Sequence, residues 1–308
     1  GIPHIYASSM HDLFFAQGYT QAQDRWWQME FFRHVGSGTI EELVGKNSDL
    51  LAADIFLRSL GWRHVAEQEV ENCDHEALAR VQAFTDGVNA EYEEQILPLA
   101  ERHLAGAQRL LDVGCGEGQV ARRAARAGAT TVVGCDPSAT QVVAARERAG
   151  GPVYTRADAD RLPVPNESFD AVVACLVFEH IDAVDAALAE VARVLVPGGR
   201  FVFFLNHPLL QTPGSGWIDD QIIEPPEQYW RVGPYLDEAE TVEEVAAGVH
   251  IRFVHRPLSR YVNAMAAVGL TLTEMVEPAP PPGFLARAHE YEQAASIPRL
   301  LLLKAERR

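Results

Sequence analysis

The chain has 308 residues, of which 47% are hydrophobic and 22% are charged, and it carries a formal net charge of -17 at pH 7. This size and composition predict one or two globular domains. An acidic surface repels polyanions, and the sequence has no local basic patch, so nucleic acids and anionic membranes are not expected as partners. The sequence has no signal peptide and no apolar run of about 18 residues, which predicts a cytoplasmic protein.

The cysteines are widely spaced and form no C-x-x-C motif. They are Cys73, Cys115, Cys135 and Cys175, and three of them fall in or beside predicted strands. This pattern predicts buried free thiols in a reducing compartment. We expect no metal site.

Residues 1 to about 90 form a segment rich in aromatic side chains. A short extended piece over 2–7 precedes helical spacing from Asp12 to about His34. The aromatic residues of this helix occupy more than one face; they are Phe14, Phe15, Tyr19, Trp26, Trp27, Phe31 and Phe32. A helix that is apolar over so wide an arc is expected to be buried against something larger.

The order of three stretches, GIPHIYA, DLFFAQGYTQAQDRWWQMEFFR and DIFLRSLGWRHVA, resembles the start of penicillin acylase precursors. That resemblance implies an N-terminal-nucleophile hydrolase, in which a serine freed by self-cleavage is the nucleophile. The catalytic chain of such an enzyme would begin beyond this point, and nothing in the sequence matches it. We therefore expect a helical fragment without amidase chemistry, whose aromatic residues favour homo-oligomer formation.

A second helical pattern starts at Asp74 and continues to Tyr92, and Pro98 is expected to interrupt it. The acylase resemblance fades near Ala90. We therefore predict two domains, a mainly helical one over 1–90 and a second one over 91–308, joined as a chimera within one helical run.

The stretch LLDVGCGEGQV reads as a buried strand, a glycine loop and the start of a helix, with glycines at Gly114, Gly116 and Gly118. A dinucleotide loop would need a third glycine where Gln119 stands, and Asp112 and Glu117 would repel a pyrophosphate. A nicotinamide dehydrogenase is therefore disfavoured. S-adenosylmethionine carries a sulfonium and an ammonium and no phosphate, so these acids favour it as the cofactor.

The following segments alternate between strand and helix patterns. The second strand, TTVVGCD, ends in Asp136, the third, PVYTRAD, ends in Asp158, and FDAVVACLVF and FVFFLN are the fourth and fifth. Strand, glycine loop, helix, strand and acid in this order predict an α/β fold with an open parallel sheet, in which the acids lie at the carboxyl edge.

Five motifs, LLDVGCGEGQV, VVGCDPS, ADADRLPVPNESFDAVVA, FEHI and LVPGGRFVFF, together resemble class I S-adenosylmethionine-dependent methyltransferases. The resemblance implies a Rossmann-like seven-stranded sheet with helices on both faces and the last strand antiparallel between the fifth and sixth. It implies that Asp112 orients the ammonium, Asp136 the ribose, and Asp158 with Ala159 the adenine. The cofactor-binding residues it implies are Asp112, Gly114, Cys115, Gly116, Gly118, Asp136, Pro137, Asp158, Ala159 and Cys175.

A long excursion over about 207–256 follows the fifth strand and is expected to cap the pocket. Its candidate substrate walls are Trp217, Tyr229, Trp230 and Tyr235, and Thr241 to Glu244 resembles a capping box that would start a short helix.

Methyl transfer is an in-line displacement that needs alignment, exclusion of water and, for some acceptors, a general base. We expect a small-molecule acceptor, and the candidate catalytic residues are His180, Glu179 and His207. Two alternatives remain open at this point: a non-catalytic cofactor-binding or scaffold chimera, and the remnant of a penicillin-acylase-type amidase that lacks its catalytic chain.

Overall fold

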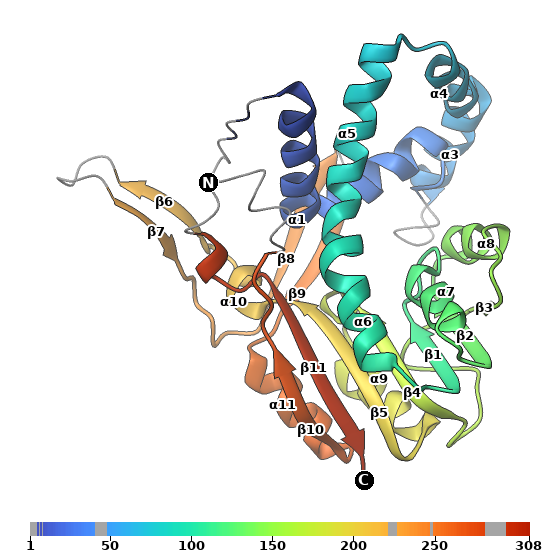
Figure 1. The fold of residues 1–308 in the computed structure, drawn as a ribbon, viewed down its shortest axis with the longest axis vertical. Coiled ribbons are helices and arrows are strands. Elements are labelled where there is room, and N and C mark those ends of the chain that lie inside the picture. The colour runs from blue at the N-terminus through green and yellow to red at the C-terminus, as the bar shows by residue number, and fades with distance from the viewer. Residues whose placement is uncertain are drawn as a thin grey trace. The chain divides into compact units, whose positions relative to one another are not determined.

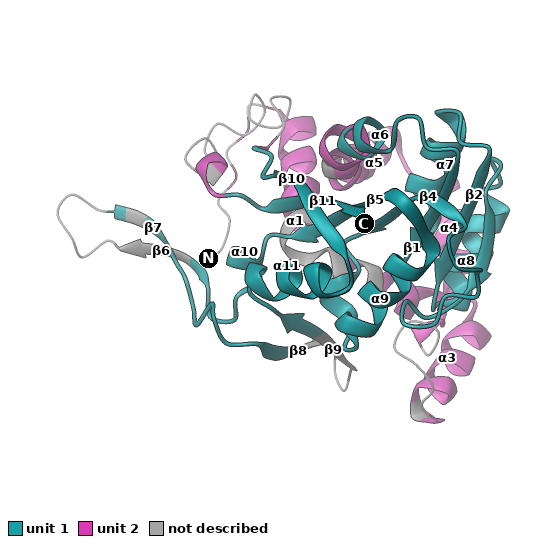
Figure 2. Cartoon of the chain, turned by 90° about the horizontal axis from the view of Figure 1, so that it is seen from below, with its two compact units in different colours: residues 1, 99–279, 298–308 teal, residues 2–98, 280–297 magenta. Residues whose placement is uncertain are grey.

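A computed structural model of the chain divides into two compact units (Figure 2). The N-terminal unit comprises Ile2–Pro98 and Pro280–Ile297, and the C-terminal unit comprises Leu99–Ala279 and Pro298–Arg308. The structure describes residues 5, 7, 9–40, 48–220, 227–246, 249–280 and 294–308.

The described part of the N-terminal unit is helical (Figure 1). Its helices are α1 (Met10–Ser37), α3 (Ser48–Leu60), α4 (Trp62–Glu71) and α5 (His75–Glu91). The Ser9 side chain caps α1 by accepting a hydrogen bond from the Asp12 amide. The helix expected from Asp12 to about His34 is thus confirmed, whereas most of the extended piece expected over 2–7 lies outside the described residues.

Two glycines allow α1 and α5 to approach each other closely. A Cβ atom on Gly18 would lie 2.0 Å from the Phe84 carbonyl oxygen, and one on Gly87 would lie 1.9 Å from the Phe15 carbonyl oxygen. The rings of Phe15 and Tyr19 are buried, whereas Phe32 is 51% exposed, and the side chains of Trp26, Trp27 and Phe31 lie outside the described set. The aromatic helix is therefore only partly covered in this chain.

The expected interruption at Pro98 is wrong. A π-helical segment, η1 (Tyr92–Ile96), follows α5 directly, and Pro98 is the second residue of α6 (Leu97–Leu104). Proline lacks an amide hydrogen and its ring crowds the preceding turn, but both effects are small at the start of a helix. The wider π turn therefore lets the helical run continue past the proline.

The C-terminal unit contains a seven-stranded sheet in the order β10-β11-β5-β4-β1-β2-β3. The strands are β1 (Arg109–Val113), β2 (Thr131–Asp136), β3 (Val153–Arg156), β4 (Phe169–Cys175), β5 (Leu195–Asn206), β10 (Leu270–Val276) and β11 (Leu300–Arg307). Only β11 is antiparallel to its neighbours in this sheet, β5 and β10. The predicted seven-stranded Rossmann-like sheet and the place of its last strand are confirmed.

Helices flank this sheet and complete its core. They are α7 (Gln119–Arg126), α8 (Ala139–Glu147), α9 (Val184–Val194) and α11 (Leu258–Ala267). The middle of β4 is fully buried, as its continuous apolar sequence predicts for a strand covered on both faces. Because β1 is parallel to both β2 and β4, the carboxyl ends of these three strands meet at one edge of the sheet.

The insertion over 207–256 contains two hairpins rather than irregular chain. After α10 (Pro208–Gln211), β6 (Gly216–Asp220) pairs with β7 (Glu227–Arg231), and β8 (Ala239–Ala246) pairs with β9 (Val249–His255). The short helix expected after Thr241 is wrong, because Thr241 to Glu244 lies inside β8. Pairing with β9 suits the β-branched residues there and overrides the local capping signal.

The four cysteines are free thiols. Three of them are buried as predicted, at Cys115, Cys135 and Cys175, whereas Cys73 is exposed. Among the described residues, no helix combines the length and hydropathy needed to cross a membrane.

Candidate functional site

The glycine loop between β1 and α7 uses its three glycines in different ways. All three have positive φ, at +70° for Gly114, +50° for Gly116 and +80° for Gly118. A Cβ atom on Gly114 would lie 2.3 Å from Cγ2 of Val177, and one on Gly118 would lie 2.3 Å from the Tyr154 hydroxyl. On Gly116 the nearest such heavy atom would be 4.0 Å away. Gly116 is therefore the glycine that leaves space for something other than the protein.

Backbone hydrogen bonds hold this loop in place. The amides of Gly114 and Cys115 both donate to the Cys135 carbonyl on β2, at 2.8 and 3.0 Å, and the Gly118 amide donates to the Cys115 carbonyl at 2.7 Å. The loop is thus tied to the neighbouring strand and is a preformed feature of the sheet edge.

Asp112 lies under the loop as the fourth residue of β1 and is 2% exposed. Its Oδ2 accepts a hydrogen bond of 3.1 Å from the Ala121 amide in the first turn of α7. Burial raises the pKa of Asp112 to about 7, the Ala121 hydrogen bond opposes this, and the nearby Asp136 charge adds to it. A cation placed beside this carboxylate would stabilise its charged form.

Asp136 ends β2 and contacts the loop directly. Its Oδ2 accepts from the Gly116 amide at 2.9 Å, and its Oδ1 accepts from the Ser138 amide at 2.9 Å. Each carboxylate oxygen can accept a further hydrogen bond. Asp136 can therefore support the loop and still accept hydrogen bonds from a ligand hydroxyl.

The role expected for Glu117 needs correction. Its carboxylate forms an ion pair with Arg148, just after α8, so its charge is offset within the protein. The argument against a phosphate ligand therefore rests on Asp112 and Asp136, two carboxylates held at the same loop, and the Asp136 charge adds to the raised pKa of Asp112.

The remaining predicted cofactor residues lie along the same edge. Asp158 is exposed in the loop after β3 and its carbonyl accepts from the Arg161 amide, while Ala159 packs against the core of the unit. Pro137 is exposed directly after Asp136, and Cys115 and Cys175 are buried just beyond β1 and at the end of β4. The structure thus places all of these residues at or just beyond strand ends.

Glu179 and His180 lie in a short helix, η2 (Phe178–His180), just after β4. Glu179 is 4% exposed, and its Oε1 accepts from the backbone amide and the side-chain amide of Asn206, at 2.7 and 3.1 Å. Burial raises the pKa of Glu179 to about 7. His180 is exposed, and its ring centroid lies 4.8 Å from that of Phe253 on β9.

His207 is held by contacts that favour a structural role. The residue caps α10, because its Nδ1 accepts from the Leu209 amide at 3.1 Å. The ring proton must then be on Nε2, which lies 2.8 Å from Oε1 of Glu277. Both ring nitrogens are engaged, so the ring would have to break its cap to accept a proton.

The residues predicted to form the substrate walls lie in different surroundings. The Tyr235 hydroxyl accepts from the Leu258 amide at 2.9 Å, so it stabilises the start of α11. Tyr229 is 45% exposed on β7, Trp230 is half-buried beside it, and the Trp217 side chain lies outside the described set.

Two residues that contact the segments of the site were missed by sequence reasoning. Tyr154 packs on the glycine loop from β3, and Arg256, only 4% exposed, binds the segment after β4. The alternation of β3 could have indicated that Tyr154 faces inward, whereas no local pattern marks Arg256. Within the described part of the chain, no group of three or more His, Cys, Asp or Glu side chains is arranged to hold a metal ion.

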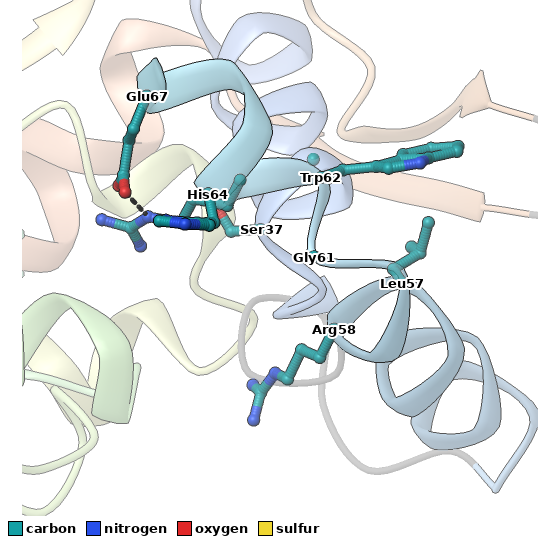
Figure 3. A pocket seen from close by; sticks show the side chains of 9 residues that line it. Ser37, Leu57, Arg58, Gly61, Trp62, His64 and Glu67 are labelled. Carbon is teal, nitrogen blue, oxygen red and sulfur yellow. Dashed lines mark hydrogen bonds and ion pairs between the residues drawn. The ribbon is translucent and has the colours of Figure 1, made fainter. Parts of the chain in front are cut away.

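A separate hollow of about 270 Å³ lies within the N-terminal unit (Figure 3). It is lined by Gly36, Ser37, Leu57, Arg58, Gly61, Trp62, Arg63, His64 and Glu67. The Ser37 hydroxyl donates to the Arg33 carbonyl at 2.9 Å, His64 lies 3.1 Å from the Gln68 side chain, and Arg63 pairs with Glu67 at 3.0 Å. Ser37 and His64 therefore do not form a nucleophile and base pair here.

Comparison with known proteins divides the chain in a similar way. Residues 111–203 match the family model described as a methyltransferase domain. This part of the chain is therefore similar to methyltransferase domains. Residues 1–117 match the penicillin amidase family model, so the amidase match extends past the boundary expected near residue 90.

Individual relatives cover only parts of the chain. The methyltransferase domain is 42% identical over 119 residues to the ubiquinone/menaquinone biosynthesis C-methyltransferase of Methylobacterium nodulans, covering 36% of this chain and 47% of that protein. The N-terminal segment is 37% identical over 90 residues to penicillin G acylase of Escherichia coli, covering 29% of this chain and 10% of that enzyme. The chain thus spans about half the length of the methyltransferase and a tenth of the acylase.

The fold agrees with these matches. A crystal structure of an S-adenosylmethionine-dependent methyltransferase from Mesorhizobium loti aligns with a TM-score of 0.59 and 29% identity, covering 71% of this chain and 98% of that protein.

Proposed function

We propose that the chain transfers a methyl group from S-adenosylmethionine to a small-molecule acceptor. The observation that supports this most directly is the loop at Gly116, where a Cβ atom would come no nearer than 4.0 Å to the surrounding side chains, together with two acids at this loop, Asp112 and Asp136, that are almost fully buried. Buried carboxylates without a bound cation are costly, so the site suits a positively charged ligand.

The residues present fit the methyl donor. Asp112 would stabilise its cationic methionine part, Asp136 would accept hydrogen bonds from its ribose, and Asp158 with Ala159 would lie beside its adenine. When bound, S-adenosylmethionine supplies an activated methyl group on a sulfonium. The protein's own contribution is then to align the acceptor with that methyl group and to exclude water.

The acceptor side is proposed to lie near the end of β4. His180 is exposed there and can accept a proton from an acceptor hydroxyl. Glu179, with a pKa near 7, is buried behind it and would act through its neighbours. The acidic net charge and the small-molecule pathway named for the Methylobacterium relative favour a small acceptor over a nucleic acid.

Isothermal titration with S-adenosylmethionine and S-adenosylhomocysteine tests the donor site. Asp136→Ala should weaken both by about tenfold or more, since it removes a charged acceptor. Asp170→Ala is a matched control: Asp170 also accepts backbone amides, from Gln108 and Arg109, but at the opposite end of the sheet. Absence of binding by the wild type, or equal binding by Asp136→Ala, would refute the donor assignment.

Methyl transfer itself is tested by following the labelled methyl group of S-adenosylmethionine into a panel of small-molecule acceptors. The expected result is label in at least one acceptor and none after heat denaturation. Donor binding without turnover of any acceptor would instead favour the non-catalytic reading.

We further propose that residues 91–308 carry this activity alone and that residues 1–90 contribute little to it. A chain shortened to 91–308 should bind S-adenosylhomocysteine as the full chain does, and a collapse of that affinity would show that the first ninety residues are integral.

The free cysteines support a cytoplasmic location.

A further inference from the structure

The segment from Val177 to Asp182 joins the glycine loop to the proposed acceptor side. It follows β4, and its Val177 side chain fills the position where a Cβ atom on Gly114 would lie. At its short helix η2 the His180 amide donates to the Val177 carbonyl at 3.0 Å and the Ile181 amide donates to the Phe178 carbonyl at 3.3 Å. Such short helices depend on other residues for their geometry.

Arg256 supplies that support from the junction between β9 and α11. Its Nη1 donates to the Phe178 carbonyl at 3.2 Å, and its Nη2 donates to the carbonyls of Ile181 and Asp182 at 2.7 and 3.1 Å. One guanidinium group therefore binds the carbonyls at both ends of the segment that contains His180.

The position suits arginine better than lysine. A guanidinium group presents several N–H donors in one rigid plane, whereas a lysine ammonium is a single compact centre. Arg256 is 4% exposed, and burying its charge is costly unless it is compensated. Glu238 lies 3.8 Å from its Nε, and the Arg256 charge in turn lowers the pKa of Glu179 against the effect of burial.

Glu179, which lies within the segment, binds it to the end of β5. The Oε1 atom of Glu179 accepts from both the backbone and the side-chain amide of Asn206, the last residue of β5, whereas its buried Oε2 has no hydrogen-bond partner. The segment is thus fixed between the end of β5 and the junction that follows the β8–β9 hairpin. His180 projects from it onto Phe253 of the same hairpin.

We propose that Arg256 is a positioning residue for the acceptor side: by binding the carbonyls of Phe178, Ile181 and Asp182, it fixes the His180 ring against Phe253. The proposal rests on the proposed methyl-transfer function. It requires no contact between Arg256 and the acceptor or the donor.

Arg256→Met tests the proposal, with Arg256→Lys as the conservative variant and Arg260→Met as the matched control. Arg260 is also an arginine of this region, but it pairs with the carboxylates of Asp185 and Glu238 and not with the 178–182 carbonyls. Each full-length variant is labelled with ¹³C-histidine, and the His180 ring resonance is assigned with His180→Gln. The affinity for S-adenosylhomocysteine is measured by titration, and the near-ultraviolet circular dichroism reports the fold.

In Arg256→Met we expect the His180 resonance to lose the shift caused by the Phe253 ring. The affinity for S-adenosylhomocysteine should stay within about threefold of wild type, because the contacts of the glycine loop are intact. Arg256→Lys should restore part of the shift, and Arg260→Met should leave it unchanged. If Arg256→Met does not fold, Arg256→Lys decides, since a partial loss of the shift supports the proposal and a wild-type resonance overturns it.

An unchanged His180 resonance in folded Arg256→Met, or an equal change in Arg260→Met, would overturn the proposal. Failure of the proposed function would look different: the wild type would not bind S-adenosylhomocysteine, while the histidine resonances would still report whether Arg256 fixes His180.

Discussion

The Asp136 carboxylate accepts a 2.9 Å hydrogen bond from the Gly116 amide, so the acid that ends β2 fixes the loop that follows β1. Of the three loop glycines, this is the one where a Cβ atom would have no close neighbour, the nearest being Gln141 Oε1 at 4.0 Å. The acid and the open space together define where a ligand would contact the backbone, and they suggest variants that separate ligand binding from folding.

Gly116→Ala is expected to weaken donor binding more than it weakens the fold. The positive φ of +50° costs an alanine about 1 kcal/mol of stability, while the new methyl group would occupy the space proposed for the donor. Gly128→Ala is the control, because Gly128 has a φ of +105° and also faces open space, but at the far end of α7. We expect S-adenosylhomocysteine affinity to fall about tenfold or more in Gly116→Ala alone; a similar fall in both variants would contradict the assignment.

Asp112→Asn should stabilise the fold at high pH and impair donor binding. With a pKa of about 7 in the folded state against 3.8 in the unfolded chain, Asp112 retains its proton longer when folded. The folded state therefore binds more protons between these values, and its stability falls as pH rises from about 4 to about 7. Asparagine does not ionise, so the variant does not lose stability in this way, and its side chain can still accept a hydrogen bond from the Ala121 amide.

The measurement for Asp112→Asn is thermal unfolding without ligand from pH 4 to pH 8. The variant's advantage over wild type should be small at pH 4 and grow to at most about 4 kcal/mol by pH 8, and its S-adenosylhomocysteine affinity should be lower than that of wild type at pH 8. A stability difference that does not change with pH would argue against the raised pKa.

Much of the sheet could be predicted because its signals are local. Buried parallel strands read as continuous apolar runs, and a glycine loop followed by an acid at the next strand end specifies the order of elements around Asp112 and Asp136. The same reasoning failed at Thr241 and Pro98. There the outcome depended on a partner strand and on a π turn, neither of which leaves a mark in the neighbouring residues.

For the candidate site, the sequence predicted the positions of residues but not their partners. Residues at strand ends lie where the sequence indicated, but the partners that determine their chemistry come from distant positions. Arg148 offsets the charge of Glu117, Glu277 holds His207, and Arg256 holds the segment with His180. Such pairings depend on tertiary geometry, so spacing alone cannot reveal them.

The exposed apolar residues of the N-terminal unit predict self-association. Ile55 and Phe56 on α3 are 61% and 60% exposed, and Trp62 on α4 is 53% exposed. Side chains of this kind mark an interaction surface where they form a contiguous apolar patch. Sedimentation velocity should show a concentration-dependent dimer for wild type and a monomer for Ile55→Ser/Phe56→Ser. Val153→Ser is the control, since Val153 is 66% exposed in the other unit; a wild type that stays monomeric would rule the prediction out.

The loop that carries Asp158 and Ala159 should depend on Arg193. This α9 side chain donates to the carbonyls of Leu162 and Val164 at 3.0 and 2.9 Å and to Oδ1 of Asn166 at 2.7 Å. Its partner Glu190 lies 2.6 to 2.8 Å away and accepts from the Leu162 amide at 2.7 Å. Hydrogen bonding to Arg193 holds the pKa of Glu190 below its usual value, so this stabilisation is present at neutral pH and is lost as pH falls through the lowered value.

Arg193→Met should therefore cost roughly 1–3 kcal/mol of stability at pH 7, since both side chains are partly exposed and screening by solvent reduces the loss. It should also raise the susceptibility of residues 157–168 to limited proteolysis and weaken S-adenosylhomocysteine binding. Arg123→Met is the control, because Arg123 forms a surface ion pair with Glu101. Cleavage of the loop at the wild-type rate in Arg193→Met would show that the strands on either side hold it without the arginine.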